Sequence, residues 1–206
     1  MKEHWNQVYQ TKGQSDRSWY QQRPNLSLEL IVASGVGREE GIIDVGGGTS
    51  NLVDFLLGDG YKNLAVLDIS GEALSQLRER LGTRAASVEW LESDVTSFQP
   101  THPFGLWHDR AVFHFLTKPE DRRAYIDTLR KTLTPGGTVV ISTFSLEGPL
   151  KCSGLDVIRH DEKSLMAEFG LEFTLQDVRH ETHKTPWDSE QDFIYLRLKR
   201  VKSYEL

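Results

Sequence analysis

Short apolar runs alternate with longer segments of helical periodicity along most of the chain. A β-branched or otherwise apolar run bounded by turn residues predicts a strand, whereas apolar residues three and four positions apart predict a helix. The predicted strands are 41–45, 63–68, 87–91, 104–109 and 138–142. The predicted helices are 51–57, the segment between Ser70 and Gly82, 119–133 and a short helix at 162–169.

Residues at the ends of these helices support the assignment. Ser70 has a side-chain oxygen suited to an N-cap, and Gly82 is a suitable stop. Pro119 stands at the first position of its helix and is followed by acidic residues, which favour the positive end of the helix dipole. The segment Pro135-Gly136-Gly137 ends this helix before the next strand.

The two ends of the chain differ from this alternating middle. Residues 1–40 predict an aromatic-rich helical segment. The runs 171–178 and 192–198 have no helix between them, which predicts an antiparallel pair at one edge of a sheet. Together with the alternating strands and helices, these features predict an α/β fold with a doubly wound, mostly parallel sheet.

The composition is that of an ordinary soluble globular domain. The 206 residues include 24 Lys+Arg and 30 Asp+Glu, which gives a net charge of −6, and 38% of them are hydrophobic. A chain of this size buries roughly 70% of the surface that its unfolded form exposes, so it needs no disulfide or metal to hold its core.

Charge and cysteine content narrow the possible partners. A net negative charge without a Lys/Arg block disfavours binding to nucleic acid. No stretch approaches the roughly 18 apolar residues that span a bilayer, and the N-terminus lacks an apolar signal core, so we expect a cytoplasmic protein without a membrane partner. The single cysteine, Cys152, rules out an internal disulfide and a cysteine-cluster metal site, and no metal is predicted.

The first predicted strand ends in a glycine-rich turn, Asp44-Val45-Gly46-Gly47-Gly48. In a doubly wound sheet the ligand binds beyond the carboxyl ends of the strands, and glycines there let the backbone approach it. A dinucleotide fingerprint needs a further glycine where Asn51 stands, so pyrophosphate binding is disfavoured. Asp44 would repel a pyrophosphate, whereas it can accept hydrogen bonds from a cation such as an α-ammonium group.

Acidic residues also follow the next two predicted strands. Asp68 closes the second strand, where a carboxylate accepts both hydroxyls of a ribose. Asp94 follows the third strand, where it can accept a hydrogen bond from the exocyclic amine of adenine. The implied ligand contains ribose, adenine and an amino-acid-like cation without an obligatory phosphate, and S-adenosylmethionine has these parts.

At these positions the sequence resembles the class I S-adenosylmethionine-dependent methyltransferases, over about residues 40–145. The resemblance rests on 44–48, Asp68, Ser93-Asp94-Val95 and Leu133-Thr134-Pro135-Gly136-Gly137. It implies a Rossmann-like sheet of seven strands whose last strand is antiparallel. The implied product is S-adenosylhomocysteine.

The resemblance also implies roles for individual residues. Gly46 and Gly48 line the methionine moiety, Asp68 binds the ribose, and Asp94 with Val95 binds the adenine. The full set of expected cofactor-binding residues is Asp44, Gly46, Gly47, Gly48, Asp68, Ile69, Ser93, Asp94, Val95 and Trp19.

We expect one domain over residues 1–206. It comprises a helical cap at 1–40, a cofactor-binding core at 41–145, and an acceptor-side insert with the edge hairpin at 146–206.

A shorter resemblance concerns the methyl acceptor. The segment Trp107-His108-Asp109-Arg110-Ala111, continued by residues 120–125, is similar to the branch that methylates thiols and halides. His108 separates the Trp from the Asp, so the register of this match is imperfect. A broader resemblance is to small bacterial methyltransferases of varied substrate.

Three residues near the end of the fourth strand are candidates for catalysis. His114 is the first candidate for a general base, and Arg110 is the candidate for orienting an anionic group. Asp109 is the third candidate, and Arg110 alternatively pairs with Asp109 or Asp121. A thiol acceptor, with a reference pKa of roughly 8.5, needs little help from a base. The aromatic residues expected to close over the methyl group are Trp5, Tyr9 and Trp19.

Other conspicuous residues have simpler interpretations. Cys152 lies in an insert after the fifth strand, at the border of the expected acceptor pocket, and we interpret it as an incidental small residue. His180 and His183 lack a nearby third ligand, so metal binding is disfavoured. Residues 199–202 are expected to form a solvated tail.

The sequence thus predicts methyl transfer from S-adenosylmethionine to a small soluble acceptor, with a thiol-like nucleophile slightly ahead of oxygen or nitrogen. Protein lysine methylation is the alternative reaction. A module that binds S-adenosylmethionine or S-adenosylhomocysteine without catalysis, and an NAD-dependent oxidoreductase, are alternatives of other classes. The oligomeric state stays open between a monomer and a homodimer.

Overall fold

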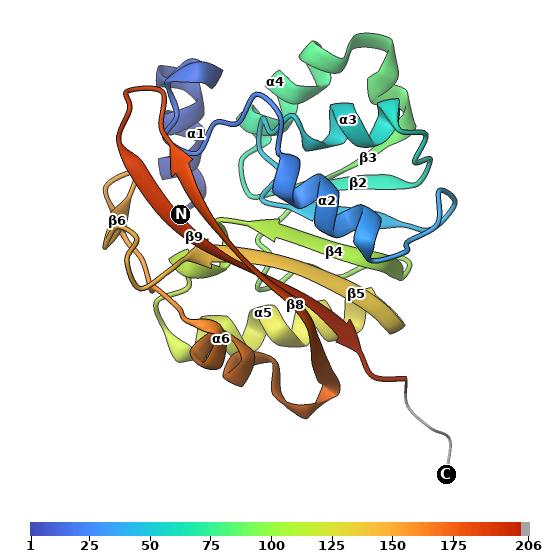
Figure 1. Ribbon diagram of the computed structural model, residues 1–206. Helices are drawn as coiled ribbons and strands as arrows, with labels where there is room; N and C mark the ends of the chain where they lie inside the picture. Colours follow the sequence, from blue (N-terminus) through green and yellow to red (C-terminus); the bar gives the residue numbers. More distant parts are fainter. Residues whose placement is uncertain (203–206) are drawn as a thin grey trace.

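The computed structural model describes residues 1–202, and within them seven strands form one sheet. The strand order is β3-β2-β1-β4-β5-β9-β8, in which β3 to β5 are parallel and β9 is antiparallel to both its neighbours (Figure 1). The strands are β1 (Ile42–Val45), β2 (Leu64–Asp68), β3 (Val88–Glu92), β4 (Phe104–Arg110), β5 (Leu133–Phe144), β8 (Phe173–Lys184) and β9 (Glu190–Arg200). The predicted fold class is confirmed.

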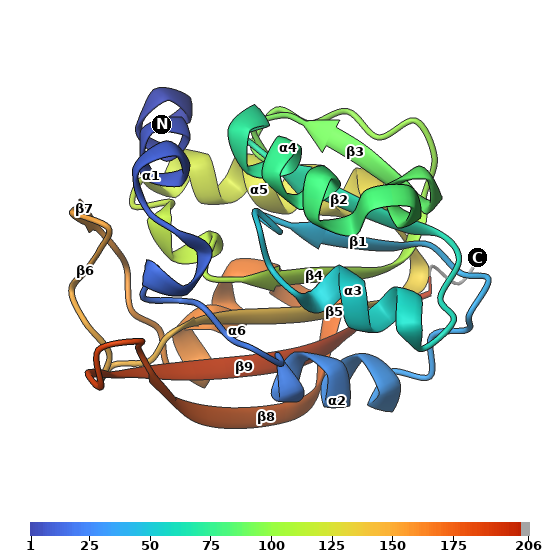
Figure 2. The same ribbon diagram turned by 90° about the horizontal axis from the view of Figure 1, so that it is seen from above.

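Helices cover both faces of this sheet (Figures 1 and 2). Side chains from α2, α3 and α4 pack on one face, and side chains from α5 and α6 pack on the other. The N-terminal α1 packs against α4. The helices are α1 (Lys2–Thr11), α2 (Asn25–Ala33), α3 (Leu52–Gly58), α4 (Gly71–Leu81), α5 (Pro119–Thr132) and α6 (Glu162–Phe169).

Alternation of side chains along the buried strands supplies both halves of the core. In β1, Ile42 belongs to the cluster under α2–α4, whereas Ile43 and Val45 belong to the cluster under α5 and α6. All four residues of β1 are buried, including Asp44, which lies on the same face as Ile42. A carboxylate is therefore built into an otherwise apolar layer, next to the glycine turn.

The residues predicted to begin or end helices do so in the structure. Ser70 Oγ accepts a hydrogen bond from the backbone amide of Ala73 at 3.2 Å, and Gly82 ends α4 with a φ of 57°. Pro119 is the first residue of α5. These local signals place α4 and α5 between their strands and so help to bring the strand ends to one edge.

Two predictions about strand ends are wrong. The β5 strand begins at Leu133 rather than at 138, because Leu133 already pairs with Phe104 of β4 and the glycine segment is accommodated by a register shift. The expected tail at 199–202 is partly strand: Arg200 ends β9, pairs with Phe173, and donates hydrogen bonds to the carbonyls of Arg130 and Leu133. The edge hairpin is therefore longer than its apolar run suggests.

Among residues 1–202, no helix has the length and apolar character needed to cross a membrane.

Candidate functional site

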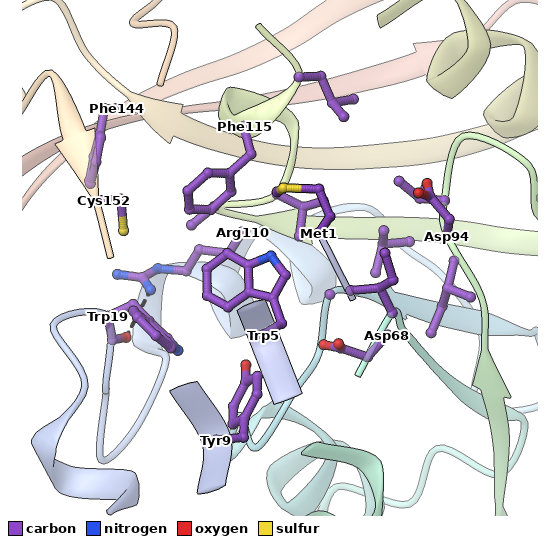
Figure 3. A pocket seen from close by; sticks show the side chains of 18 of the residues that line it. Met1, Trp5, Tyr9, Trp19, Asp68, Asp94, Arg110, Phe115, Phe144 and Cys152 are labelled. Carbon is purple, nitrogen blue, oxygen red and sulfur yellow. Dashed lines mark hydrogen bonds between the residues drawn. The ribbon is translucent and has the colours of Figure 1, made fainter. Parts of the chain in front are cut away.

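A cavity lies beyond the carboxyl ends of the parallel strands, under α1 (Figure 3). Its floor comes from the last residues of β1, β2, β4 and β5 and from the segment after β3. Its roof comes from the N-terminal segment, which contributes Met1, Trp5, Tyr9 and Trp19. The predicted site residues that line it are Trp19, Gly46, Asp68, Ile69, Ser93, Asp94, Val95 and Arg110.

One end of the cavity is acidic. Asp68 is the last residue of β2, and its Oδ1 accepts a hydrogen bond from the amide of Ser70 at 2.8 Å. Burial raises the pKa of Asp68 to about 7, against the lowering effect of backbone hydrogen bonds from Ser70 and Gly48. Asp94 Oδ1 accepts hydrogen bonds from the backbone amide and the hydroxyl of Thr96, at 2.9 and 2.7 Å. The two carboxylates come from successive strand ends and reach one cavity.

The glycine turn allows two close approaches. Gly46 has a φ of 63°, and a Cβ added there would lie 2.0 Å from Val112 Cγ2. Gly48 has a φ of 51°, and a Cβ there would lie 2.2 Å from the hydroxyl oxygen of Tyr9. Side chains are therefore excluded from this turn both by its left-handed backbone and by the groups packed against it.

Asp44 does not line the main cavity but an adjoining, smaller pocket. This pocket also includes Gly47 and His108, and it shares Gly46, Trp19 and Arg110 with the main cavity. Asp44 Oδ1 lies 2.7 Å from His108 Nδ1, inside the layer between the sheet and α2. Of the predicted glycines, Gly48 lines neither space.

The other end of the main cavity contains one cation. Arg110 Nε donates to the hydroxyl of Tyr195 at 2.8 Å, and Nη1 donates to the carbonyl of Trp19 at 3.1 Å. Its guanidinium carbon lies 4.5 Å from the centre of the Phe193 ring, and Nη2 lies 3.5 Å from a carboxylate oxygen of Glu181. Within the described chain, Nη2 is buried without a hydrogen-bond partner.

Aromatic rings fill the space between the two ends. Trp5 packs edge-on against Phe115 and against Trp19, with ring centres 5.1 and 5.9 Å apart. Phe144, labelled in Figure 3, is part of the same wall. Phe193 completes the wall next to Arg110. The predicted aromatic residues of the N-terminal segment therefore all face the cavity.

Cys152 also lines the cavity, in keeping with its expected place at the border of the acceptor pocket, and its interpretation as an incidental small residue stays a prediction. It lies in β6 (Lys151–Cys152), which forms a small hairpin with β7 (Leu155–Asp156). It is 5% exposed, and burial raises the pKa of its thiol. The insert after β5 thus brings Cys152 to the cavity, as its expected place on the acceptor side predicts.

His114 and Asp109 do not line the cavity. His114 is fully buried, with its ring centre 4.5 Å from the rings of both Phe115 and Phe144. Burial lowers the pKa of His114 to about 3, and its Nδ1 accepts a long hydrogen bond from the Phe144 amide. This environment disfavours the expected role as a base.

Asp109 has a structural environment. Its carboxylate accepts hydrogen bonds from the amides of Val112 and Phe113 and from the hydroxyl of Tyr125, at 2.9, 3.2 and 2.7 Å. Burial raises the pKa of Asp109 to about 6. The side chain thereby fixes the turn after β4 and so the direction of Arg110, with which it shows no ion pair in the described chain.

The sequence analysis missed the residues that β9 and α2 bring to the site. Phe193, Tyr195 and Gln191 come from β9, and Ser27 comes from α2. His108 had a usable signal, because a polar residue interrupts a buried strand and is the register partner of Asp44.

Comparisons with known proteins agree with this architecture. Residues 42–137 match the family model described as "Methyltransferase domain". The "eEF1A lysine and N-terminal methyltransferase" of Mus musculus is 27% identical over 120 residues, which are 58% of this chain. The protein of the same name from Homo sapiens is 24% identical over 124 residues. The matched region spans only 17% of the length of each of these relatives.

Solved structures show the same fold over nearly the whole chain. A structure from work on the conversion of a disulfide bond into a thioacetal group during echinomycin biosynthesis has a TM-score of 0.80, at 19% identity, over 100% of this chain and 93% of that one. The N-methyltransferase NodS from Bradyrhizobium japonicum WM9, in complex with S-adenosylhomocysteine, has a TM-score of 0.72, at 17% identity, over 95% and 97%.

A doubly wound sheet with this strand order, a glycine turn after β1 and carboxylates at the following strand ends defines a Rossmann-like nucleoside-binding protein of the methyltransferase type. By these matches, residues 42–137 of the chain form a methyltransferase domain, and the sheet around it has the fold that solved methyltransferase structures share. The predicted methyltransferase class is confirmed over residues 42–137. The S-adenosylhomocysteine in the NodS structure agrees with the predicted cofactor.

Proposed function

We propose that this enzyme methylates a small molecule that carries an anionic group and a soft nucleophile, with a thiol ahead of oxygen or nitrogen. The observation that carries the proposal is the half of the cavity around Arg110. Aromatic rings wall it, and Nη2 of the largely buried Arg110 has no hydrogen-bond partner, although a Glu181 carboxylate oxygen lies 3.5 Å from it. An aromatic pocket with one guanidinium group in its wall fits a small apolar acid.

The acidic half of the cavity fits the nucleoside of the cofactor. In this proposal Asp68 binds the ribose hydroxyls, and Asp94 with Val95 binds the adenine. The methionine part passes Gly46 toward the smaller pocket, where Asp44 offers a carboxylate to its ammonium group. The reactive end then faces the aromatic rings and Arg110.

The lack of a base in the wall supports a thiol. Among the cavity-lining side chains of the described chain none is His or Lys, and the carboxylates are those of Asp68 and Asp94 at the cofactor end. When bound, the cofactor supplies a methyl group already activated by its sulfonium. The protein then has to orient the nucleophile, exclude water and favour its ionised form. A thiol with a pKa of roughly 8.5 near the Arg110 cation meets this condition without a base.

Protein lysine methylation is the second candidate, because the curated relatives include "eEF1A lysine and N-terminal methyltransferase". A lysine ammonium has a pKa of roughly 10.4 and must lose a proton before transfer. It would also approach Arg110, a like charge. For these two reasons we rank a protein lysine below a small acidic molecule as the methyl acceptor.

Labelled cofactor distinguishes the two candidates. The enzyme is supplied with methyl-labelled S-adenosylmethionine and, separately, with 2-mercaptobenzoate, thiophenol, salicylate, anthranilate or proteins of a cell extract. We expect label in 2-mercaptobenzoate above the other three small molecules, since it combines the thiol with a carboxylate for Arg110. Label that ends only in protein bands would overturn the small-acceptor proposal in favour of lysine methylation.

A further inference from the structure

Three polar side chains from three separate elements form a buried chain beside the glycine turn. Asp44 lies near the end of β1 and lines the smaller pocket. His108 lies on β4, and Ser27 lies on α2. His108 Nδ1 is 2.7 Å from Asp44 Oδ1, and His108 Nε2 is 2.9 Å from Ser27 Oγ. Asp44, His108 and Ser27 are 5%, 3% and 1% exposed, so all three have lost their water.

Core packing alone does not explain why these three hydrogen-bonded side chains are polar. On the same face of the two strands, Ile42 and Leu106 precede Asp44 and His108, and both are part of the apolar cluster under α2. Burying polar groups costs free energy that their hydrogen bonds largely offset, and apolar residues of similar shape often serve as well. Asp44, at one end of this hydrogen-bonded set, lines the smaller pocket and can bind a polar ligand group there. A set of apolar residues could not make that contact.

The arrangement of hydrogen bonds fixes the orientation of Asp44. A carboxylate only accepts, so the proton in the contact with Oδ1 lies on His108 Nδ1. The Ser27 hydroxyl meets the second ring nitrogen and holds the imidazole in its plane. In the described chain no hydrogen bond reaches Asp44 Oδ2, which lies 2.7 Å from where a Cβ of Gly47 would stand. This oxygen is directed at the glycine turn.

The hydrogen bond from His108 also matters for the ability of Asp44 to bind a ligand. A buried carboxylate oxygen without a hydrogen-bond donor has lost its water without replacement, which costs free energy. The ring N–H of His108 bonds to one oxygen of Asp44 and leaves the other oxygen free for a ligand. His108 therefore supplies the hydrogen bond that water would make to an exposed carboxylate.

We propose that His108 and Ser27 are positioning residues that orient the Asp44 carboxylate toward the α-ammonium group of the cofactor. This inference rests on the cofactor placement in the proposed function. In this proposal, His108 and Ser27 allow the enzyme to bind S-adenosyl amino acids more tightly than simple adenine nucleosides. Neither residue needs to touch the reacting atoms.

A pair of ligands isolates this role. S-Adenosylhomocysteine has the α-ammonium group, whereas 5′-methylthioadenosine has the same nucleoside and thioether without the amino-acid end. We expect His108→Leu to weaken S-adenosylhomocysteine binding roughly 10- to 100-fold, and to change 5′-methylthioadenosine binding less than about twofold. His108→Asn, which keeps a donor for Asp44, should recover part of the loss, and Ser27→Ala should give a smaller loss of the same selectivity.

Calorimetric titration of each variant with both ligands gives the result. Thr132→Val is the matched control: it removes a buried hydroxyl that bonds to the Thr128 carbonyl in α5, at the amino end of β5, and should alter neither affinity. If His108→Leu does not fold, Ser27→Ala and His108→Asn carry the test. Equal losses for both ligands in these variants would reduce the pair to a structural role. Failure of the wild type to bind S-adenosylhomocysteine would instead contradict the cofactor placement itself.

Discussion

The hydroxyl of Tyr9, on the N-terminal helix, lies directly over Gly48 of the glycine turn: a Cβ at residue 48 would stand 2.2 Å from it. The same Tyr9 contributes its ring to the cavity roof and its carbonyl to hydrogen bonds from Arg17 and Gln76. The roof and the cofactor turn are therefore fitted to each other at one atom. This contact couples the position of the N-terminal segment to the geometry of the turn.

Gly48→Ala should disrupt this fit. A non-glycine residue with positive φ costs roughly 1–2 kcal/mol, and the methyl group also collides with Tyr9. We expect a lower melting temperature and at least a tenfold loss of S-adenosylhomocysteine affinity, measured by thermal unfolding and calorimetry. Gly58→Ala is the control, because a Cβ there meets no atom within 4 Å and the residue lies in α3.

The collision can be separated from the backbone strain. Tyr9→Phe removes the hydroxyl oxygen, so it should restore part of the affinity in the Gly48→Ala background while leaving the strain. Additive losses in this double-mutant cycle would show that the two residues do not communicate.

Asp68 should make cofactor binding depend on pH. Its pKa in the free enzyme is raised to about 7 by burial, so below pH 7 the carboxyl group is mostly protonated. If the ribose hydroxyls require the carboxylate, affinity should rise with pH through 7 and level off above pH 8. At pH 6 binding should be about tenfold weaker than on the plateau.

Calorimetry in buffers of different ionisation enthalpy should detect proton release on binding near pH 6.5. Asp68→Asn should remove both the proton release and the pH dependence. A flat profile in the wild type would show that the protonated form binds equally well.

Parts of the site that follow from topology were predictable from the sequence. Carboxyl ends of parallel strands meet at one edge of the sheet, so Asp68 and Asp94 had to come together once the strands were identified. The glycine turn was predictable for the same reason. Local residue type and strand order are sufficient for this half of the cavity.

The acceptor half depends on packing that no local pattern encodes. His114 has a plausible chemistry, yet the turn after β4 directs it against Phe144 and away from the cavity. Phe193 and Tyr195 reach Arg110 only because β9 inserts beside β5, far along the chain. Their place follows from the register of an edge hairpin whose length was underestimated.

Arg110 should determine preference for an anionic acceptor. Arg110→Gln removes the charge while keeping a hydrogen-bonding group near Tyr195 and the Trp19 carbonyl. We expect KM for 2-mercaptobenzoate to rise roughly 10- to 100-fold, since a hydrogen bond to a charged group is worth about 1.5–3 kcal/mol. KM for thiophenol should change less than about threefold.

Steady-state kinetics with both thiols measure this difference, and S-adenosylhomocysteine titration shows whether the cofactor site is intact. Equal changes for the two acceptors would mean that Arg110 supports the cavity wall without binding the anion.

Cys152 should be protected from alkylation in the folded enzyme. It is 5% exposed, and burial raises the pKa of its thiol despite the nearby Arg110 cation. Only the thiolate reacts, and its fraction falls tenfold for each unit by which the pKa rises. At pH 7.5 we expect iodoacetamide to modify the folded chain at least about 100-fold more slowly than the urea-unfolded chain. Because the chain has one cysteine, the intact mass reports the reaction directly. Equal rates in the two states would contradict burial of the β6–β7 hairpin against the cavity.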